Sequence, residues 1–322
     1  MISVVMPVFN CESYVEDAIH SILNQTYRNF EFIIIEDGST DSTLQKILTF
    51  KDDRIKLLIN EKNKGLVFSL NRGLQEVQGE YIARMDGDDI ALPQRFEKQI
   101  EYMEKNQNCL VCGSSYESFG AENNIYDMTQ YFGLLSVVDV PITHPSSLFR
   151  CSIITSGKIQ YHSFADNGVE DLRFWFEIFR YSNFNSHSFS NLPDILLKYR
   201  IHESQISGSN NLKHKNSACK IRRFNLQDFF EAFKIEFKFE NIDKITYNDF
   251  LNIENAFQQT SKYFGTKNHK ELVNKVLLYV FLSMDNRRYK LKSLLILLRY
   301  VSLGDLKKAF LNILGRKYLK RY

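Results

Sequence analysis

Cysteine is scarce in this chain of 322 residues, and its pattern excludes a disulfide-rich fold. The five cysteines are scattered and odd in number, unlike the paired cysteines of a small secreted domain. Cys109 and Cys112 have the spacing of half a zinc or redox site, but no second pair exists. Because they stand in an apolar run, we interpret them as buried strand residues of a protein from a reducing compartment.

Long apolar runs are also missing, which excludes a membrane-spanning helix. The run Leu294–Leu298 is far shorter than the ~20 residues that cross a bilayer. Met1–Met6 already has the pattern of a strand, with no basic region before it, so we expect no signal peptide. These features predict a cytoplasmic protein, with attachment to the inner face of the membrane as an open alternative.

Proline is rare, and none occurs after residue 210, where the apolar spacing becomes helical throughout. We therefore predict two parts, an α/β domain over residues 1–208 and a helical, basic region over residues 209–322. Residues 1–211 carry 18 basic and 28 acidic residues, a net charge of −10, whereas residues 212–322 carry 23 and 10, a net charge of +13. An acidic body with a basic end indicates that the two parts meet different partners.

Strand and helix patterns alternate over the first 90 residues. Continuous apolar runs at Ile2–Val8, Phe30–Ile35 and Ile55–Ile59 are typical of strands buried on both faces, and helical spacing follows each run. A fourth strand ends at Asp86. We predict an α/β fold with a mostly parallel sheet flanked by helices. The segment Tyr116–Val140 has no clear period, and we interpret it as a mobile segment over the site.

Three carboxylates crowd the end of the fourth strand, in Asp86-Gly87-Asp88-Asp89. Like charges repel one another, but together they suit a hard divalent cation, which prefers carboxylate oxygens. At the carboxyl end of a parallel strand, the cation would lie where open α/β sheets bind ligands. An exposed acidic turn is the simpler alternative. A calcium-binding loop is excluded, because Ile90 and Ala91 occupy the positions of its next ligand and its required glycine.

Glycine is absent from the first strand-to-helix turn, Pro7–Cys11. This absence excludes the glycine-rich pyrophosphate loop of a dinucleotide-dependent oxidoreductase. Asp37 follows the second strand, where its carboxylate could accept the N–H of a uracil or of another base. The sequence Asp37-Gly38-Ser39 is equally ordinary turn chemistry, so both interpretations stay open.

Taken together, these motifs resemble glycosyltransferase family 2, over roughly residues 1–205. The resemblance implies the GT-A fold, a Rossmann-like domain that uses a nucleotide-diphosphate sugar with Mn²⁺ or Mg²⁺. It rests on motifs in the family's order and spacing: Val5–Asn10, Ser21–Tyr27, Phe32–Asp41, Asn63–Gly65, Gly79–Ala83 and Asp86–Asp89. By the resemblance, the residues that bind the nucleotide are Pro7, Phe9, Glu12, Asp37 and Gly65.

The resemblance also assigns residues around the diphosphate. Asp86 would contact the ribose or the water shell of the metal, and Asp88 would ligate the metal. His202, in Tyr199–Ser207, resembles a family motif whose histidine reaches the metal or the diphosphate. His144, in a polar turn, is a further candidate contact of the diphosphate or the acceptor.

Glu170 and Asp171 form a second carboxylate site at the start of a predicted helix. An inverting sugar transfer needs a base that takes the proton of the acceptor hydroxyl. The resemblance assigns this role to Asp171, with Glu170 beside it at the nucleotide sugar. Asp at a helix N-terminus is also a routine cap, and the helix dipole favours its ionised form in either case.

The end of the chain is strongly basic. Residues 287–322 hold eleven Lys and Arg and a single acid, Asp305. Apolar stripes with basic flanks suit an anionic membrane surface, although a solvated face of packed helices fits as well. No recognised nucleic-acid motif accompanies the charge, so we expect no nucleic-acid partner.

We therefore expect an inverting, metal-dependent glycosyltransferase with a UDP-sugar donor, UDP-Glc or UDP-Gal being favoured. The resemblance implies a saccharide acceptor linked to a polyprenyl diphosphate lipid, in the synthesis of O-antigen or capsule. Two alternatives stay open, namely a catalytically idle nucleotide-sugar-binding module and transfer to a protein or a soluble acceptor.

Overall fold

The computed structural model describes residues 1–129, 133–163, 169–203, 205, 212–239 and 246–260, with positions 273, 276 and 277. The predicted basic tail, residues 287–322, lies outside the described residues. The strands are β1 (Ile2–Val8), β2 (Phe30–Glu36), β3 (Ile55–Ile59), β4 (Tyr81–Arg84), β5 (Ile90–Ala91), β6 (Val111–Gly120), β7 (Ile125–Tyr126), β8 (Leu148–Arg150) and β9 (Phe189–Ile201). The helices are α1 (Val15–Leu23), α2 (Thr43–Leu48), α3 (Leu66–Leu74), α4 (Arg95–Lys105), α5 (Ser152–Thr155), α6 (Glu170–Tyr181), α7 (Leu212–Ala232) and α8 (Tyr247–Thr260).

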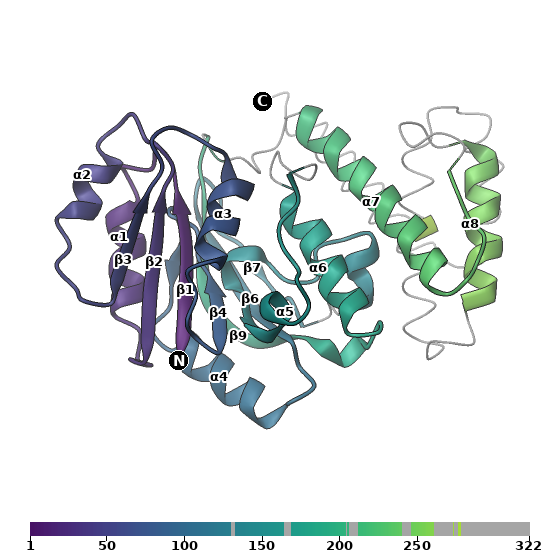
Figure 1. Cartoon of the computed structure of the whole chain (residues 1–322), viewed down its shortest axis with the longest axis horizontal. Coiled ribbons are helices and arrows are strands. Elements are labelled where there is room, and N and C mark those ends of the chain that lie inside the picture. The colour runs from purple at the N-terminus through teal and green to yellow at the C-terminus, as the bar shows by residue number, and fades with distance from the viewer. Residues whose placement is uncertain are drawn as a thin grey trace. The chain divides into compact units, whose positions relative to one another are not determined.

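The strands form one sheet in the order β3-β2-β1-β4-β8-β6-β9-β5, and β7 pairs with β6. β1 to β4 are parallel, and Figure 1 shows the arrowheads of β1, β2 and β3 pointing the same way. β8 is antiparallel to β4, while β6 and β9 are parallel to each other. The predicted α/β fold with a largely parallel sheet is therefore confirmed. The strand ends Val8, Glu36 and Arg84 share one edge, because parallel strands finish on the same side.

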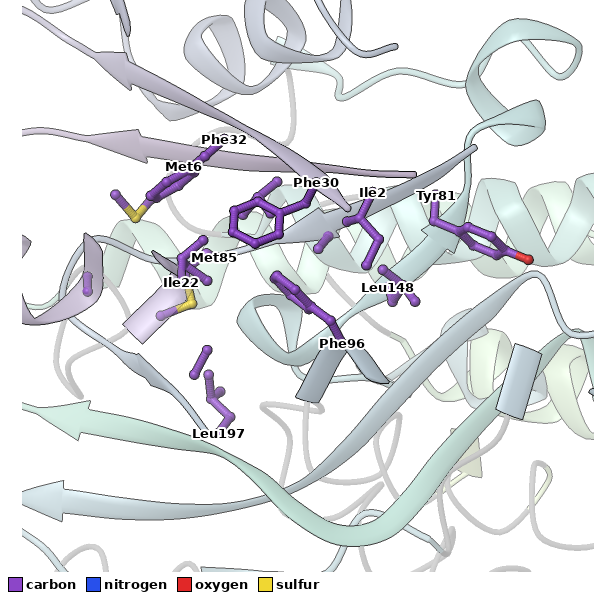
Figure 2. Packing of buried hydrophobic residues seen from close by; sticks show 14 of the residues in the cluster. Ile2, Met6, Ile22, Phe30, Phe32, Tyr81, Met85, Phe96, Leu148 and Leu197 are labelled. Atoms are coloured by element: carbon purple, nitrogen blue, oxygen red, sulfur yellow. The ribbon is translucent and has the colours of Figure 1, made fainter. Parts of the chain in front are cut away.

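Alternate side chains of the central strands face opposite layers of helices. Ile2, Val4 and Met6 of β1 belong to a buried cluster that includes residues of α1 and α4. Figure 2 shows Phe96 of α4 near Phe30 of β2, and their ring centroids are 5.9 Å apart. Burying a side chain of this size stabilises the fold by about 1.5–3 kcal/mol.

Helix α3 covers the other face of β1 and β2. Gly73 of α3 lies so close to the sheet that an added Cβ would be 2.7 Å from Cγ1 of Val5 and 2.8 Å from Cδ1 of Ile35. The apolar runs of β1 and β2 therefore reflect burial on both faces, as predicted from the sequence. The same prediction is wrong for β3, which is only partly buried because it lies at the edge of the sheet.

Two predictions of local structure need correction. Tyr116–Gly120, predicted to lack regular structure, belongs to β6, and β7 and a 3₁₀ turn at Gly133–Val137 follow within the same segment. The sequence also predicts a strand over Leu192–Tyr199, and the structure extends this strand, β9, from Phe189 to Ile201. Both differences arise where polar and apolar residues do not alternate regularly, as in residues 116–120 and 189–191, so the period of two that identifies a strand is missing.

The chain divides into two compact units, Met1–Ile221 and Arg222–Tyr322. The predicted boundary between residues 208 and 209 stays a prediction. In the second unit, phenylalanines of α7 and α8 form the described core: Phe229, Phe230, Phe250 and Phe257. None of the described helices has both the length and the apolar character needed to cross a bilayer.

Candidate active site

A cavity of about 510 Å³ opens at the edge of the sheet where β4 ends. Five of the residues that the sequence predicts for the site line it: Asp86, Asp88, His144, Glu170 and Asp171. Asp86 and Asp88 follow β4, His144 begins a 3₁₀ turn before β8, and Glu170 and Asp171 begin α6. The fold therefore brings together carboxylates that are far apart along the chain.

The acidic turn after β4 has the donor atoms of a cation site. One carboxylate oxygen from each of Asp86, Asp88 and Asp89 lies within 4.8 Å of the other two. Oδ2 of Asp89 is buried and has no hydrogen-bond partner among the described residues. Burial, and then the charges of Asp88 and Asp86, raise the pKa of Asp89 well above its usual range. Oxygen ligands and repelling charges of this kind fit Mg²⁺ or Mn²⁺.

Arg200, near the end of β9, fixes the acidic turn from the strand that pairs with β5. Its backbone N–H donates to Oδ1 of Asp89 (2.8 Å), and its Nε donates to the backbone oxygen of Asp88 (2.7 Å). The guanidinium lies 4.6 Å from the ring centroid of Tyr14 and 4.4 Å from that of Phe119. Stacked between two rings, Arg200 can hold the turn in one conformation.

His202 contacts the predicted metal ligand. Its Nε2 lies 2.9 Å from Oδ2 of Asp88, and its ring packs 4.8 Å from that of Tyr14. The cluster of potential ligand atoms consists of the three aspartates, so direct ligation by His202 stays a prediction.

Asp171 lies in the first turn of α6. Val169 occupies the N-cap position without a side-chain cap, and Oδ1 of Asp171 accepts a hydrogen bond from the N–H of Leu172 (2.7 Å). Burial, and then the neighbouring charge of Glu170, raise the pKa of Asp171 to about 6. A carboxylate with this pKa is ionised at neutral pH and remains a better proton acceptor than an ordinary aspartate.

His144 is buried beside this pair. Its Nε2 and the hydroxyl of Tyr161 are 2.7 Å apart, and its Nδ1 lies 3.5 Å from Oε1 of Glu170. Burial, and then the charge of Arg84, lower the pKa of His144 to about 3. The imidazole is therefore neutral at physiological pH, and it can orient its neighbours but cannot supply a positive charge to a diphosphate.

We expect kcat/KM to rise with pH through an apparent pKa of about 6, because a base at Asp171 must be ionised and is protonated below that pH. E170Q should move this acidic limb to lower pH, since it removes the charge that helps to raise the pKa of Asp171. The measurement is the pH profile of kcat/KM for both proteins. An acidic limb with an apparent pKa near 4 in the unsubstituted protein, or the same apparent pKa in E170Q as in the unsubstituted protein, would argue against Asp171 as the base.

The residues predicted to bind the nucleotide lie in β1 and on neighbouring loops, and none of them lines the cavity. Phe9 is 43% exposed directly after β1, and Oε2 of Glu12 accepts a hydrogen bond from the N–H of Ser42. Pro7 lies within β1, opposite Ile35 of β2. Gly65 adjoins Leu66, which does line the cavity.

Asp37 is 3% exposed and holds the loop that follows β3. Its Oδ1 accepts hydrogen bonds from Asn60 (2.6 Å) and from the N–H of Lys64 (2.9 Å), and its Oδ2 accepts one from the N–H of Gly65 (2.9 Å). A carboxylate has about four acceptor sites, so these bonds leave about one for a ligand. Contact between Asp37 and a nucleotide base therefore stays a prediction. The structure adds a second role, in which Asp37 holds the loop after β3.

Gly38, next to Asp37, allows the loops after β2 and β3 to touch. Its φ is +69°, and an added Cβ would lie 2.4 Å from the backbone carbon of Lys62. We expect G38A to lower the free energy of unfolding by about 2–3 kcal/mol, measured as a shift in urea and thermal midpoints. Asparagine tolerates the positive φ, but its Cβ would meet the backbone of Lys62 just as that of alanine does. If G38N unfolded at the same midpoint as the unsubstituted protein, the contact with Lys62 would not be the cause of the destabilisation in G38A.

Sequence reasoning missed two contributors to the site. Arg84 is buried at the end of β4, lines the cavity and pairs with Asp86. Arg200 belongs to the same motif as His202, and this motif could have indicated that Arg200 contributes to the site. Nothing in the sequence of the motif indicates the contact between Arg200 and Asp89. Arg84 lies in a strand pattern that predicts burial, and a buried arginine is a sign of a carboxylate partner.

Comparison with known proteins gives consistent results. The sequence profile described as Glycosyl transferase family 2 matches residues 3–165. An uncharacterized glycosyltransferase of Haemophilus influenzae is 31% identical over 96% of this chain and 94% of its own length. The UDP-Glc:alpha-D-GlcNAc-diphosphoundecaprenol beta-1,3-glucosyltransferase WfgD of Escherichia coli is 34% identical over 65% of this chain and 80% of its own.

Among solved structures, TarS residues 1–349 of S. aureus in complex with UDP-GlcNAc superimposes with a TM-score of 0.61. The match covers 91% of this chain and 88% of TarS 1–349, at 16% sequence identity. At this identity the likeness concerns the fold alone.

Proposed function

Because the chain belongs to glycosyl transferase family 2 and is a glycosyltransferase, we propose that it moves a hexose from a UDP-sugar to a lipid-linked saccharide. The observation that carries this proposal is the single cavity lined by both Asp88 and Asp171. UDP-sugars appear in the names of WfgD and of the TarS complex, which supports the choice of donor. The diphosphoundecaprenol-linked acceptor in the name of WfgD supports the choice of acceptor and a role in polysaccharide synthesis.

The reaction we propose is a single displacement. The carboxylate of Asp171 takes the proton of an acceptor hydroxyl, and that oxygen forms a bond to the anomeric carbon of the donor. The bond from this carbon to the diphosphate breaks, and its electron pair leaves with the nucleoside diphosphate. Attack from the face opposite the leaving group inverts the anomeric configuration.

The acidic turn provides the place for a divalent cation. Asp88, with Asp86 and Asp89, would hold Mn²⁺ or Mg²⁺, which neutralises negative charge on a diphosphate leaving group. Arg200 keeps the turn in shape through the backbone of Asp88 and the side chain of Asp89. The buried Arg84 pairs with Asp86 and so adds a positive charge next to the acidic turn.

A lipid-linked acceptor implies that the protein works in the cytoplasm at the inner face of the membrane. The basic residues of the tail, 287–322, would contribute about 1 kcal/mol each at an anionic surface. This part of the proposal rests on the charge of the sequence.

The test is a panel of UDP- and GDP-sugars, each incubated with the protein in Mn²⁺ or in EDTA while release of the nucleoside diphosphate is measured. We expect release from a UDP-hexose with Mn²⁺, slow without an acceptor and faster with an α-N-acetylglucosaminyl diphosphate that carries a short alkyl chain. No release from any donor with either metal would refute the proposed function.

A further inference from the structure

Three tyrosine rings form an aromatic cluster in the wall of the cavity. Tyr116 of β6 stacks on Tyr126 of β7, with ring centroids 4.6 Å apart and an angle of 11° between the ring planes. The ring of Tyr199 in β9 lies 5.7 Å from that of Tyr116 at an angle of 59°. All three residues line the cavity that contains Asp88 and Asp171. We call Tyr116, Tyr126 and Tyr199 the tyrosine platform.

Tyr116 and Tyr199 anchor the tyrosine platform, and Tyr126 is its exposed member. Tyr116 and Tyr199 pack against the main buried cluster, and Tyr126 is held opposite Tyr116 by the pairing of β6 with β7. Tyr126 is 36% exposed although Tyr116 stacks on one face of its ring. An aromatic surface kept open in a cavity is available to a ligand.

The strand order places the tyrosine platform on the side of β4 opposite the predicted nucleotide loops. β1 and β2, whose loops carry the predicted nucleotide residues, lie on one side of β4. β8, β6 and β9 follow on the other side, so the tyrosine platform is separated from the nucleotide loops by the acidic turn. Figure 1 shows β6, β7 and β9 grouped away from β2 and β3.

The chemistry of this wall matches a sugar ring. A hexose has an apolar C–H face that packs on aromatic rings, and hydroxyl groups at its edge that need polar partners. Asp139, Thr143 and Gln205 line the same cavity and offer a carboxylate, a hydroxyl and an amide. A lipid chain would leave these polar groups without partners, which costs free energy.

We propose that the tyrosine platform binds the terminal sugar ring of the acceptor and directs one of its hydroxyl groups toward Asp171. The acceptor is thus a saccharide with an open C–H face on its terminal ring. This inference rests on the proposed function and adds to it the element that selects the acceptor. Tyr126 is a binding residue in this scheme and has no part in proton transfer.

The experiment compares Tyr126→Ala, Tyr126→Phe and a matched control, Tyr181→Ala. Tyr181 is an exposed tyrosine (42%) at the end of α6 that does not line the cavity. With the donor that the panel identifies, two rates are measured for each protein. One is transfer to saccharide probes, namely the alkyl N-acetylglucosaminyl diphosphate, free N-acetylglucosamine, glucose and galactose, and the other is donor hydrolysis without acceptor.

We expect Y126A to raise the acceptor KM about tenfold and to leave donor hydrolysis unchanged, because loss of one stacked ring removes a contact of this size. Y126F should stay within about twofold of the original protein, since the ring rather than the hydroxyl makes the contact. Y181A should change neither rate. An unchanged acceptor KM in Y126A, or an equal loss of hydrolysis and transfer, would overturn the inference.

The outcomes separate this inference from the proposed function. If the unsubstituted protein neither hydrolyses nor transfers any donor, the proposed function is wrong and the inference is wrong with it. If it hydrolyses the donor but transfers to none of the saccharide probes, or if Y126A transfers as well as the unsubstituted protein, the inference alone is wrong.

Discussion

Replacing Asp171 by asparagine is expected to lower kcat by about 10³-fold while the Kd of the donor changes by no more than about twofold. The amide keeps the size and the hydrogen-bonding shape of the side chain but cannot take a proton. Asp171 lines the cavity and its pKa is raised to about 6, so its ionised form is both present at neutral pH and basic enough to act. Steady-state kinetics of transfer and calorimetric titration of the donor measure the two quantities.

Two controls exclude trivial explanations for such a loss. D194N removes a carboxylate on β9 that pairs with Lys98 and does not line the cavity, so it should leave kcat unchanged. D171N itself should bind donor normally, which shows that the site is intact. Turnover of D171N within about tenfold of the original would exclude Asp171 as the base.

The stability of D171N provides a further check. The fold raises the pKa of Asp171 above its ordinary 3.8, so the native state holds this proton more readily than the unfolded state. The ionised group therefore destabilises the native state above about pH 6, and this effect disappears as the pH falls toward 4. D171N should be more stable at pH 8 by about 1 kcal/mol, allowing for the partial exposure of the side chain, and the difference should vanish near pH 4.

Replacing Asp88 by asparagine is expected to weaken donor binding in Mn²⁺ by about 100-fold or more. The substitution removes a charge from the cluster of three aspartates and leaves the backbone oxygen that Arg200 contacts in place. Donor binding by the unsubstituted protein in EDTA should fall to the level of D88N, and D88N should be insensitive to EDTA. Calorimetric titration with the donor measures all four conditions.

His202→Ala refines this test, because the imidazole contacts Asp88 at 2.9 Å. If His202 only orients Asp88, H202A should lose about 10-fold in metal-dependent donor binding. A loss as large as that of D88N would indicate that His202 ligates the cation directly. D88N that binds the donor as tightly as the original protein, with EDTA present or absent, would contradict the metal assignment.

The sequence predicts the first half of the fold well because burial on both faces leaves a clear pattern. The runs Ile2–Val8 and Phe30–Ile35 are almost entirely apolar, and both coincide with strands to within one residue. β6 was recognised only in part, because Tyr116–Gly120 mixes aromatic, acidic and small residues. The mixture arises because this part of β6 packs against the core on one side and lines the cavity on the other. The sequence alone does not show that a strand lies between a core and a cavity.

The sequence predicts which residue types form the candidate site, but it does not predict which residues they bond to. The sequence predicts a metal ligand at Asp88 and a base at Asp171, and the structure places both residues in one cavity while their roles stay predictions. The bonds of Asp37 to Asn60, Lys64 and Gly65 depend on how close the loops after β2 and β3 approach. Sequence spacing does not encode that distance.

The contact of Arg200 with the acidic turn has a consequence for synthesis on the ribosome. Arg200 and Asp89 are 111 positions apart in the chain, so at ~5–20 residues per second the turn emerges about 10 s before its support exists. The first four parallel strands can pair within that interval, because their partners are already available. The acidic turn therefore gains its support late in biogenesis, and a nascent polypeptide stalled before residue 200 would have the first parallel strands with an unsupported acidic turn.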